Sequence, residues 1–349
     1  MNLKELSEHL GLSPTTVSRA LNGYPEVSER TRQRVEDAAR RYNYSPNTRT
    51  KRLATGRAMS IGHLLPMSKE HEMVNPVFSD FIAGAGKRYA EKGYDLLLSV
   101  VRDENEADTY RDLATRGAVD GVVVHGPKVN DTRIPLLTEL GLPFVVHGRS
   151  SAVETDYNWV DVNNRRAFER ATALLLDLGH REIALLNGLA DMDFAARRYA
   201  GFRDAFLSRD LEVDDTLISH AEMTETYGYQ RMRSLLALKT PPTAVIVSSI
   251  IPALGVRRAL VEAGLSLGSD VSVVIHDDDL SYFRNDGDVP PYTATRSSVQ
   301  DAGRRTADML LEAIERPDGG SRHILMEAEL TLGQSTAPAP ALRQFLDQG

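Results

Sequence analysis

Short polar or basic side chains recur at helical spacing near the start of the chain: Thr15, Thr16, Ser18, Arg19 and Asn22. Hydroxyl, amide and guanidinium groups can hydrogen-bond to base edges, and arginine can also contact phosphate. Val17 and Leu21 lie four residues apart, so they make the opposite face of the same helix apolar. The polar face is therefore typical of a helix that enters a DNA major groove.

The flanking residues predict a helix-turn-helix around this segment. The preceding helix carries one apolar stripe, formed by Leu3, Leu6 and Leu10. Gly11 is expected to end that helix, because glycine adopts the left-handed conformation without strain. Ser13 can cap the second helix, and Pro14 suits its first turn. A third helix is expected from the N-cap Ser28 to about Tyr42, with Val35 on its buried side.

A short basic segment follows these three helices. Residues 44–57 predict a turn, one helical stretch with several cations, and a stop at Gly56. An isolated helix needs about 12–15 residues to persist in water. We therefore expect this stretch to be disordered alone and to fold on DNA.

Residues 11–22, 27–35 and 42–47 form an ordered pattern that resembles the lac/gal repressor family of bacterial transcription factors. The resemblance implies a helix-turn-helix headpiece over residues 1–46 and a hinge helix over 47–57. It also implies DNA contacts by hinge residues, namely Asn47, Arg52, Leu53 and Ala54. Leu53 is expected to be a minor-groove wedge; alternatively, it packs the hinge against the rest of the chain.

Charge is distributed unevenly along the 349 residues. Residues 1–57 hold 11 Lys and Arg against 6 Asp and Glu, a net charge of +5, which leaves −13 for the remainder of a chain whose total is −8. A basic head on an acidic body predicts that phosphate is met at one end only. The chain has no cysteine, which excludes disulfides and thiol chemistry. Without a secretory or membrane-spanning apolar run, a cytoplasmic location is expected.

From Ser60 onward, apolar runs alternate with helical stretches. Strands are predicted near residues 61–66, 94–101, 121–124, 143–146, 183–186, 244–247 and 271–275. Helices are predicted near residues 78–92, 107–116, 136–140, 165–178, 197–208, 226–238 and 251–263. Continuous Val, Ile and Leu runs between helices indicate buried parallel strands, and their number favours two doubly wound halves.

The family resemblance continues through residues 179–184 and 198–202. It implies an α/β core with two subdomains, similar to periplasmic binding proteins, over residues 58–349. The first subdomain is expected over 58–160 and 293–322, and the second over 161–292 and 323–340. A ligand would bind between them at the carboxyl ends of strands.

The resemblance and the strand ends together suggest seven effector-binding residues: Phe78, His125, Arg149, Asp161, Arg198, Ser249 and Asp277. Arg198 occupies the position of the family's effector arginine, whose planar fork can hold vicinal hydroxyls. Asp277 matches the aspartate that accepts hydroxyl hydrogen bonds. Phe78 could stack on a sugar ring, whereas Trp159 is expected to pack in the core.

Each of these assignments has an ordinary structural alternative. Arg198 could be a surface cation, and Asp277 could belong to a solvated acidic loop with Asp278. His125 and Arg149 could be plain loop residues. The segment Ser248-Ser249-Ile250 also departs from the family's usual Asn-Asp, so only Ser249 could supply a polar contact there.

The expected function is a ligand-responsive transcriptional regulator, a repressor, with a small sugar as effector. The alternative effector is a purine or another non-sugar metabolite. A solute-binding protein or an enzyme on the same core is a remote alternative, since no catalytic constellation is present. We expect no cofactor, no metal and no membrane contact.

The expected partner is near-palindromic double-stranded DNA, bound by a homodimer, because one head offers too few base contacts for a unique site. Residues 337–349 contain two prolines and cannot form the apolar heptads of a coiled coil. A built-in tetramer is therefore not expected.

Overall fold

The computed structural model describes residues 1–21, 24–44, 56–66, 75–340 and 342. The chain forms two compact units, Met1–Met59 and Ser60–Gly349. We call the first unit the head and the second the core, and we describe each by itself.

The head contains the predicted helices. They are α1 (Leu3–Leu10), α2 (Pro14–Leu21) and α3 (Glu29–Arg41). Asn2 and Glu5 form a reciprocal capping box at the start of α1, and Gly11 ends it in the left-handed conformation with φ 63°. Ser28 caps α3, as its sequence predicts.

One apolar cluster joins the three helices of the head. Leu6, Val17 and Val35 each come from a different helix and are fully buried. Leu21 is only partly buried, and Ala20 takes the inner position beside Val17. Burying this small core leaves the polar side of α2 on the surface.

The core contains two six-stranded sheets, and we name its two parts after them. The first half is built on a parallel sheet in the order β11-β5-β4-β3-β1-β2, and the second half on the order β12-β10-β9-β8-β6-β7, in which only the β10–β12 pair is antiparallel. The first sheet comprises β1 (Ser60–Pro66), β2 (Asp95–Val101), β3 (Gly121–His125), β4 (Phe144–His147), β5 (Trp159–Val162) and β11 (His323–Met326). The second comprises β6 (Ile183–Asn187), β7 (Ile218–His220), β8 (Ala244–Val247), β9 (Ser272–Asp277), β10 (Thr293–Arg296) and β12 (Glu329–Thr331).

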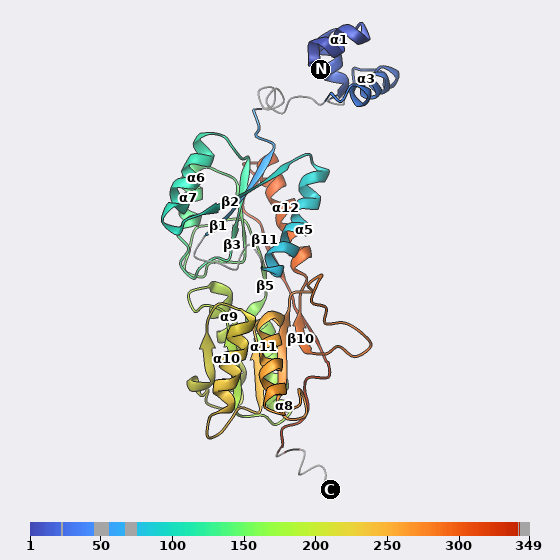
Figure 1. Ribbon diagram of the computed structural model, residues 1–349. Helices are drawn as coiled ribbons and strands as arrows, with labels where there is room; N and C mark the ends of the chain where they lie inside the picture. The colour runs from blue at the N-terminus through green and yellow to red at the C-terminus, as the bar shows by residue number, and fades with distance from the viewer. Residues whose placement is uncertain (22–23, 45–55, 67–74, 341, 343–349) are drawn as a thin grey trace. The chain divides into compact units, whose positions relative to one another are not determined.

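Helices cover both faces of the first sheet, with α5 and α12 on one face and α6 and α7 on the other (Figure 1). The core helices are α5 (Pro76–Glu91), α6 (Glu106–Thr115), α7 (Arg133–Leu140), α8 (Asn164–Asp177), α9 (Asp193–Leu207), α10 (Glu225–Leu236), α11 (Ile250–Glu262) and α12 (Val299–Glu315). Short 3-10 turns lie at Asp103–Asn105 and Asp215–Leu217. In the second half, α8 packs beside α9 and α10 beside α11.

The predicted strands and helices are present, but their list is incomplete. Helix α9 begins at Asp193, four residues before the predicted start. The predicted elements also lack α12 and the short strands β5, β7, β10, β11 and β12. These strands are three or four residues long, too short for a run of apolar residues to mark them.

The predicted subdomain boundaries are wrong at all three points where the chain passes between the halves. The first boundary divides β5, and the other two place β10 and β11 in the wrong half. Strand β5 pairs with β4 and β11, so residues 161–162 and 323–326 belong to the first half. Strand β10 pairs with β9 and β12, so residues 293–296 belong to the second half. Each of these strands is paired with its neighbours in one sheet before the chain passes to the other half. An unpaired strand would bury backbone groups that have no hydrogen-bond partner.

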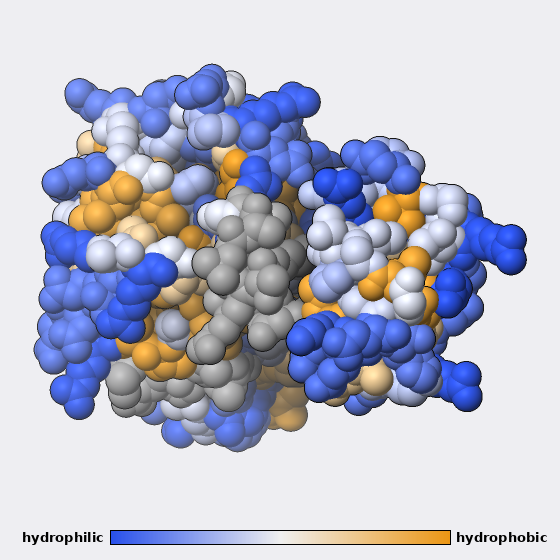
Figure 2. Space-filling view, turned by 90° about the horizontal axis from the view of Figure 1, so that it is seen from above, coloured by the Kyte–Doolittle hydropathy of each residue, from blue (hydrophilic) through white to orange (hydrophobic). Residues whose placement is uncertain are grey.

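The visible surface in Figure 2 is mainly hydrophilic, with separate apolar patches between the charged residues. Among the described residues, no helix combines the length and the apolar character needed to cross a bilayer.

Glycines allow α5 and α12 to approach at backbone distance. A Cβ atom on Gly84 would lie 2.0 Å from the carbonyl oxygen of Gln300, and one on Gly303 would lie 2.2 Å from that of Phe81. Gly86, two residues further along α5, has open space beside it. The same substitution on one helix should therefore have opposite effects at the two positions.

We expect Gly84→Ala to lower the free energy of unfolding by about 1–3 kcal/mol, because the two helices must separate. Gly86→Ala should raise it by up to about 1 kcal/mol, because alanine favours the helix. Urea denaturation of both variants measures the difference. Equal effects would contradict the close packing of α5 against α12.

Candidate nucleic-acid interface and effector site

The polar face of α2 is accessible in the head. Thr15 and Arg19 are exposed, and Thr16 and Ser18 are half-buried. Ser13 accepts a hydrogen bond from the Thr16 amide at 3.1 Å, and the two hydroxyl oxygens lie 2.9 Å apart. The start of α2 is thus fixed by its own cap, which leaves Thr15 and Arg19 as the most accessible predicted base-contacting residues.

The remaining predicted DNA-binding residues lie outside the described residues. They are Asn22, Asn47, Arg52, Leu53 and Ala54. The hinge helix and its minor-groove wedge therefore stay predictions from the sequence.

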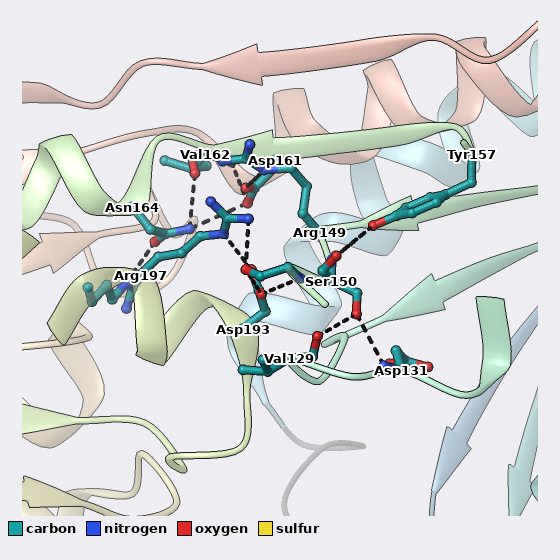
Figure 3. A network of polar contacts seen from close by, with 12 residues as sticks. Val129, Asp131, Arg149, Ser150, Tyr157, Asp161, Val162, Asn164, Asp193 and Arg197 are labelled. Atoms are coloured by element: carbon teal, nitrogen blue, oxygen red, sulfur yellow. Dashed lines mark hydrogen bonds and ion pairs between the residues drawn. The ribbon is translucent and has the colours of Figure 1, made fainter. Parts of the chain in front are cut away.

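In the core, three of the predicted effector residues, Arg149, Asp161 and Arg198, join one chain of polar contacts. Figure 3 shows the Arg149–Asp161 pair with Asn164. The Arg149 Nε donates to Asp161 Oδ2 at 2.7 Å. Asn164 contacts Asp161 Oδ1 at 3.4 Å and accepts from the Arg198 Nε at 2.7 Å. Asn164 was not predicted, although it lies only two residues beyond the end of β5. The contacts extend from the loop after β4 in the first half to α9 in the second.

Arg198 is buried and held from several sides. Its Nη1 donates to the carbonyl oxygen of Ser248 at 2.6 Å. Its guanidinium lies over the rings of Phe168 and Phe194, 4.9 and 4.8 Å from their centroids. Burial lowers the pKa of Arg198 to about 10, and the nearby carboxylates of Asp278 and Asp161 partly oppose this shift. Arg198 is therefore not a surface cation.

Two neighbouring carboxylates after β9 differ in their surroundings. Asp277 Oδ1 accepts from the Asp279 amide, whereas its Oδ2 is buried without a hydrogen bond, 3.9 Å from the Arg296 Nε. Burial raises the pKa of Asp277. Asp278 interacts electrostatically with Arg198, and burial raises its pKa to about 7.

The expectation that Asp278 is part of a solvated loop is wrong. Its side chain is only 17% exposed and its Oδ1 lies 3.5 Å from His276 Nε2. The sequence offered one signal for this position, since Asp278 is the second residue of a pair after a buried strand. Alternation along an extended chain would place the two carboxylates on different sides.

Phe78 and His125 form a second group in the first half. His125 lies edge-on to Phe78 at 5.1 Å between ring centroids and hydrogen-bonds through Nε2 to His63 Nδ1 at 2.8 Å. The other nitrogen of His63 lies 3.1 Å from the Tyr89 hydroxyl. Burial lowers the pKa of His63 to about 3, so this imidazole is neutral near pH 7. His125 is therefore embedded in a buried aromatic cluster rather than in an open loop.

Ser249 has a structural role as the N-cap of α11, where its hydroxyl accepts from the Ile251 amide at 3.3 Å. Trp159 stacks on His323 at 4.8 Å and carries the Arg149 guanidinium over its ring. A cavity of about 290 Å³ opens beside this tryptophan and includes Arg197 from the second half. Among the described residues, no cluster of His, Cys, Asp or Glu could hold a metal ion.

Comparisons with known proteins bear on both units. Residues 2–47 match the family model of bacterial regulatory proteins of the lacI family, and residues 172–336 match a periplasmic binding protein-like domain. The HTH-type transcriptional regulator AglR of Rhizobium meliloti (strain 1021) is 44% identical over 97% of this chain and 95% of its own length. The chain belongs to the lacI family. Its relatives are DNA-binding regulators, not enzymes.

Solved structures of lacI-family regulators share the whole architecture. The complex of the regulator CelR with cellobiose is 28% identical, covers 96% of this chain and 99% of its own, and has a TM-score of 0.71. The structure of the lac repressor dimer bound to operator and the anti-inducer ONPF is 25% identical in sequence. The match covers 97% of this chain and 99% of the repressor chain, with a TM-score of 0.80. The predicted headpiece and two-part α/β core are thereby confirmed.

The raised pKa of Asp278 predicts a pH dependence of stability. In the folded chain this carboxyl keeps its proton up to about pH 7, whereas in an unfolded chain it ionises near about 3.9. Between these values the folded state binds more protons, so the contribution of Asp278 to the free energy of unfolding falls as pH rises. We expect Asp278→Asn, which cannot ionise, to gain stability relative to the wild type between about pH 5 and pH 8. Thermal denaturation across this range checks it, and a constant difference in Tm would contradict the assignment.

Proposed function

We propose that this lacI-family regulator binds operator DNA through the α2 face of the head and a small sugar between the two halves of the core. The observation that carries the proposal is the buried Arg198, which Asn164 links to the Arg149–Asp161 pair of the other half. A ligand placed there would contact groups from both halves at once. Its binding would therefore bias their relative arrangement.

The charges around Arg198 favour a neutral polyol as effector. Arg149 is paired with Asp161, Arg296 lies between Asp277 and Asp279, and Asp278 lies near Arg198. Such a balance gives many hydrogen-bonding groups and little net charge, which suits hydroxyls better than a carboxylate or a phosphate. CelR, whose structure contains cellobiose, and a LacI family regulator from Enterococcus faecium with bound ribose support the choice of a sugar.

A purine effector finds less support. A planar base needs an open aromatic face to stack on. The Arg198 guanidinium already lies over one face of both Phe168 and Phe194. Phe78, the predicted stacking residue, is only 7% exposed and packs in a T-shaped arrangement against His125. The aromatic groups near Arg198 therefore hold the arginine rather than offer a slot for a base.

We propose that the working unit is a homodimer on a near-palindromic operator and that it acts in the cytoplasm as a repressor. The edge strand β2 exposes Leu98 and Val100, and Tyr282 is 90% exposed. An apolar edge strand is normally covered, and a second copy of the chain would cover it. Pairing two heads doubles the base contacts, as a specific site requires. The lac repressor structure is a dimer on its operator.

Arg19 should be needed for sequence-specific DNA binding. With an operator selected from random duplexes by the wild-type protein, we expect Arg19→Ala to lose about 1–3 kcal/mol of specific binding, because a base contact disappears. Binding to unrelated DNA should change much less. Fluorescence anisotropy of the two labelled duplexes measures both affinities.

Arg40→Ala is the matched control, since it also removes one exposed cation of the head. Arg40 lies on α3, is 70% exposed and pairs with Asp37. Its loss should weaken binding to both duplexes to a similar, small extent through the general charge effect. If Arg19→Ala behaved like Arg40→Ala, the α2 face would not be the specific interface.

A further inference from the structure

Two carboxylates, one from each half of the core, bind a serine of the opposite half. Asp193, the first residue of α9, accepts hydrogen bonds from the amide of Ser151 at 2.7 Å and from its hydroxyl. Asp80, on α5, accepts from the amide and the hydroxyl of Ser281, each at 2.7 Å. Ser151 follows β4 in the first half, and Ser281 follows β9 in the second. The two contacts therefore use the same chemistry in opposite directions.

Both carboxylates are enclosed, which strengthens these contacts. Asp193 is 1% exposed and Asp80 is 8% exposed. The second oxygen of Asp193 accepts from the Arg197 Nε at 2.5 Å, and Arg197 also donates to the Ser151 hydroxyl at 3.0 Å. Figure 3 shows Asp193 and Arg197 beside the Arg149–Asp161 pair. Ionised acceptors in enclosed positions form the stronger class of hydrogen bonds.

Backbone hydrogen bonds join the halves at the same place. The Val129 amide donates to the carbonyl oxygen of Asp191 at 2.9 Å, and the Asp193 amide donates to that of Pro127 at 3.0 Å. They enclose an antiparallel bridge between Lys128 and Met192. Because each bond joins the first half to the second, its amide can exchange with solvent only when the halves part.

We infer that Asp193–Ser151 and Asp80–Ser281 are two latches that hold the two halves of the core together in the arrangement described above. This goes beyond the proposed function, since it concerns the contacts between the halves and is independent of the identity of the sugar. Arg198 is bonded to Asn164 and Ser248 in its own half. Opening the latches would thus carry Arg198 away from the Arg149–Asp161 pair of the first half.

An exposed ion pair at the same place provides the matched control. Lys128 and Asp191 also join the two halves, with their charged atoms 3.0 Å apart, but their side chains are 60% and 55% exposed. Solvent screens such a pair, so it contributes little. Asp191→Asn and Asp193→Asn are the same chemical change, two residues apart around the start of α9, and of the two only Asp193→Asn removes an enclosed carboxylate.

Hydrogen exchange of the full-length protein, with neither DNA nor sugar present, tests the latches. We expect Asp193→Asn to raise exchange at least tenfold in peptides covering 127–131 and 189–193, after correction for intrinsic rates. Asp191→Asn should leave both peptides near wild type. The sheet peptides covering β3 and β6 should not change in either variant, because opening the halves leaves each sheet intact.

Ser281→Ala tests the second latch at a distance. It removes one hydroxyl next to Asp80, yet it should also raise exchange in residues 127–131, because both latches stabilise the same closed arrangement. If Asp193→Asn fails to fold, Ser281→Ala still tests whether the latches hold the two halves together. A change confined to residues near 281, or equal effects of Asp191→Asn and Asp193→Asn, would overturn the inference. Either of these results would leave the proposed function untouched, because the Arg19→Ala and Arg40→Ala variants test operator binding in a separate experiment.

Discussion

The structure of the second half depends on keeping one buried guanidinium satisfied. An arginine stays charged inside a protein, so its burial requires hydrogen-bond acceptors and nearby negative charge. Arg198 obtains the acceptors from Asn164 at the start of α8 and from the carbonyl oxygen of Ser248 after β8, and the negative charge from Asp161 and, above about pH 7, from Asp278 after β9. The start of α8 and the carboxyl ends of β8 and β9 must therefore meet at Arg198, and the parallel sheet brings the ends of its strands to one edge.

The same arrangement explains how ligand binding at the proposed site can change the relative arrangement of the two halves. Arg198 and its supports move as one body with the second half, while Arg149, Asp161 and the His125 cluster belong to the first. Asn164, which lies next to a crossing of the chain, connects the two sets, and the contacts of Asp193 and Asp80 join the halves around them. A ligand that bonds to both sets can therefore shift an equilibrium between arrangements of the halves.

The sequence predicted the three helices of the head because their signals are local. Caps, the glycine stop and the leucine spacing each act within one turn of helix, and Gly11, Ser13 and Ser28 behave accordingly. In the core, the long apolar strands and the glycine-terminated helices were equally visible. The sequence pointed to Arg198 and Asp277 because both match positions of the lac/gal repressor family, and Asp277 also follows a buried apolar run.

The rest depends on long-range pairing that no local pattern encodes. Strands β10 and β11 are four residues each, and their neighbours decide to which half they belong. Asp278 and Asn164 became recognisable only when Arg198 was placed beside them, since an isolated Asp or Asn after a strand is an ordinary turn residue. The opposite holds for Ser249, whose predicted polar contact is a helix cap in the structure. Helix α12 was also absent from the predicted elements, but for another reason. Its apolar residues recur at helical spacing, so the sequence did contain a local signal for it.

The central claim is that sugar and operator act on one equilibrium of this chain. The direct measurement is the operator affinity with and without a saturating sugar, together with the affinity for the same sugar with and without saturating operator. The sugar is the one that raises Tm most in a panel of mono- and disaccharides that includes cellobiose. We expect both affinities to change by the same factor, about 5- to 150-fold, and Arg198→Ala to remove the effect while operator binding without sugar persists. A sugar that binds through Arg198 but leaves operator affinity unchanged would contradict the claim.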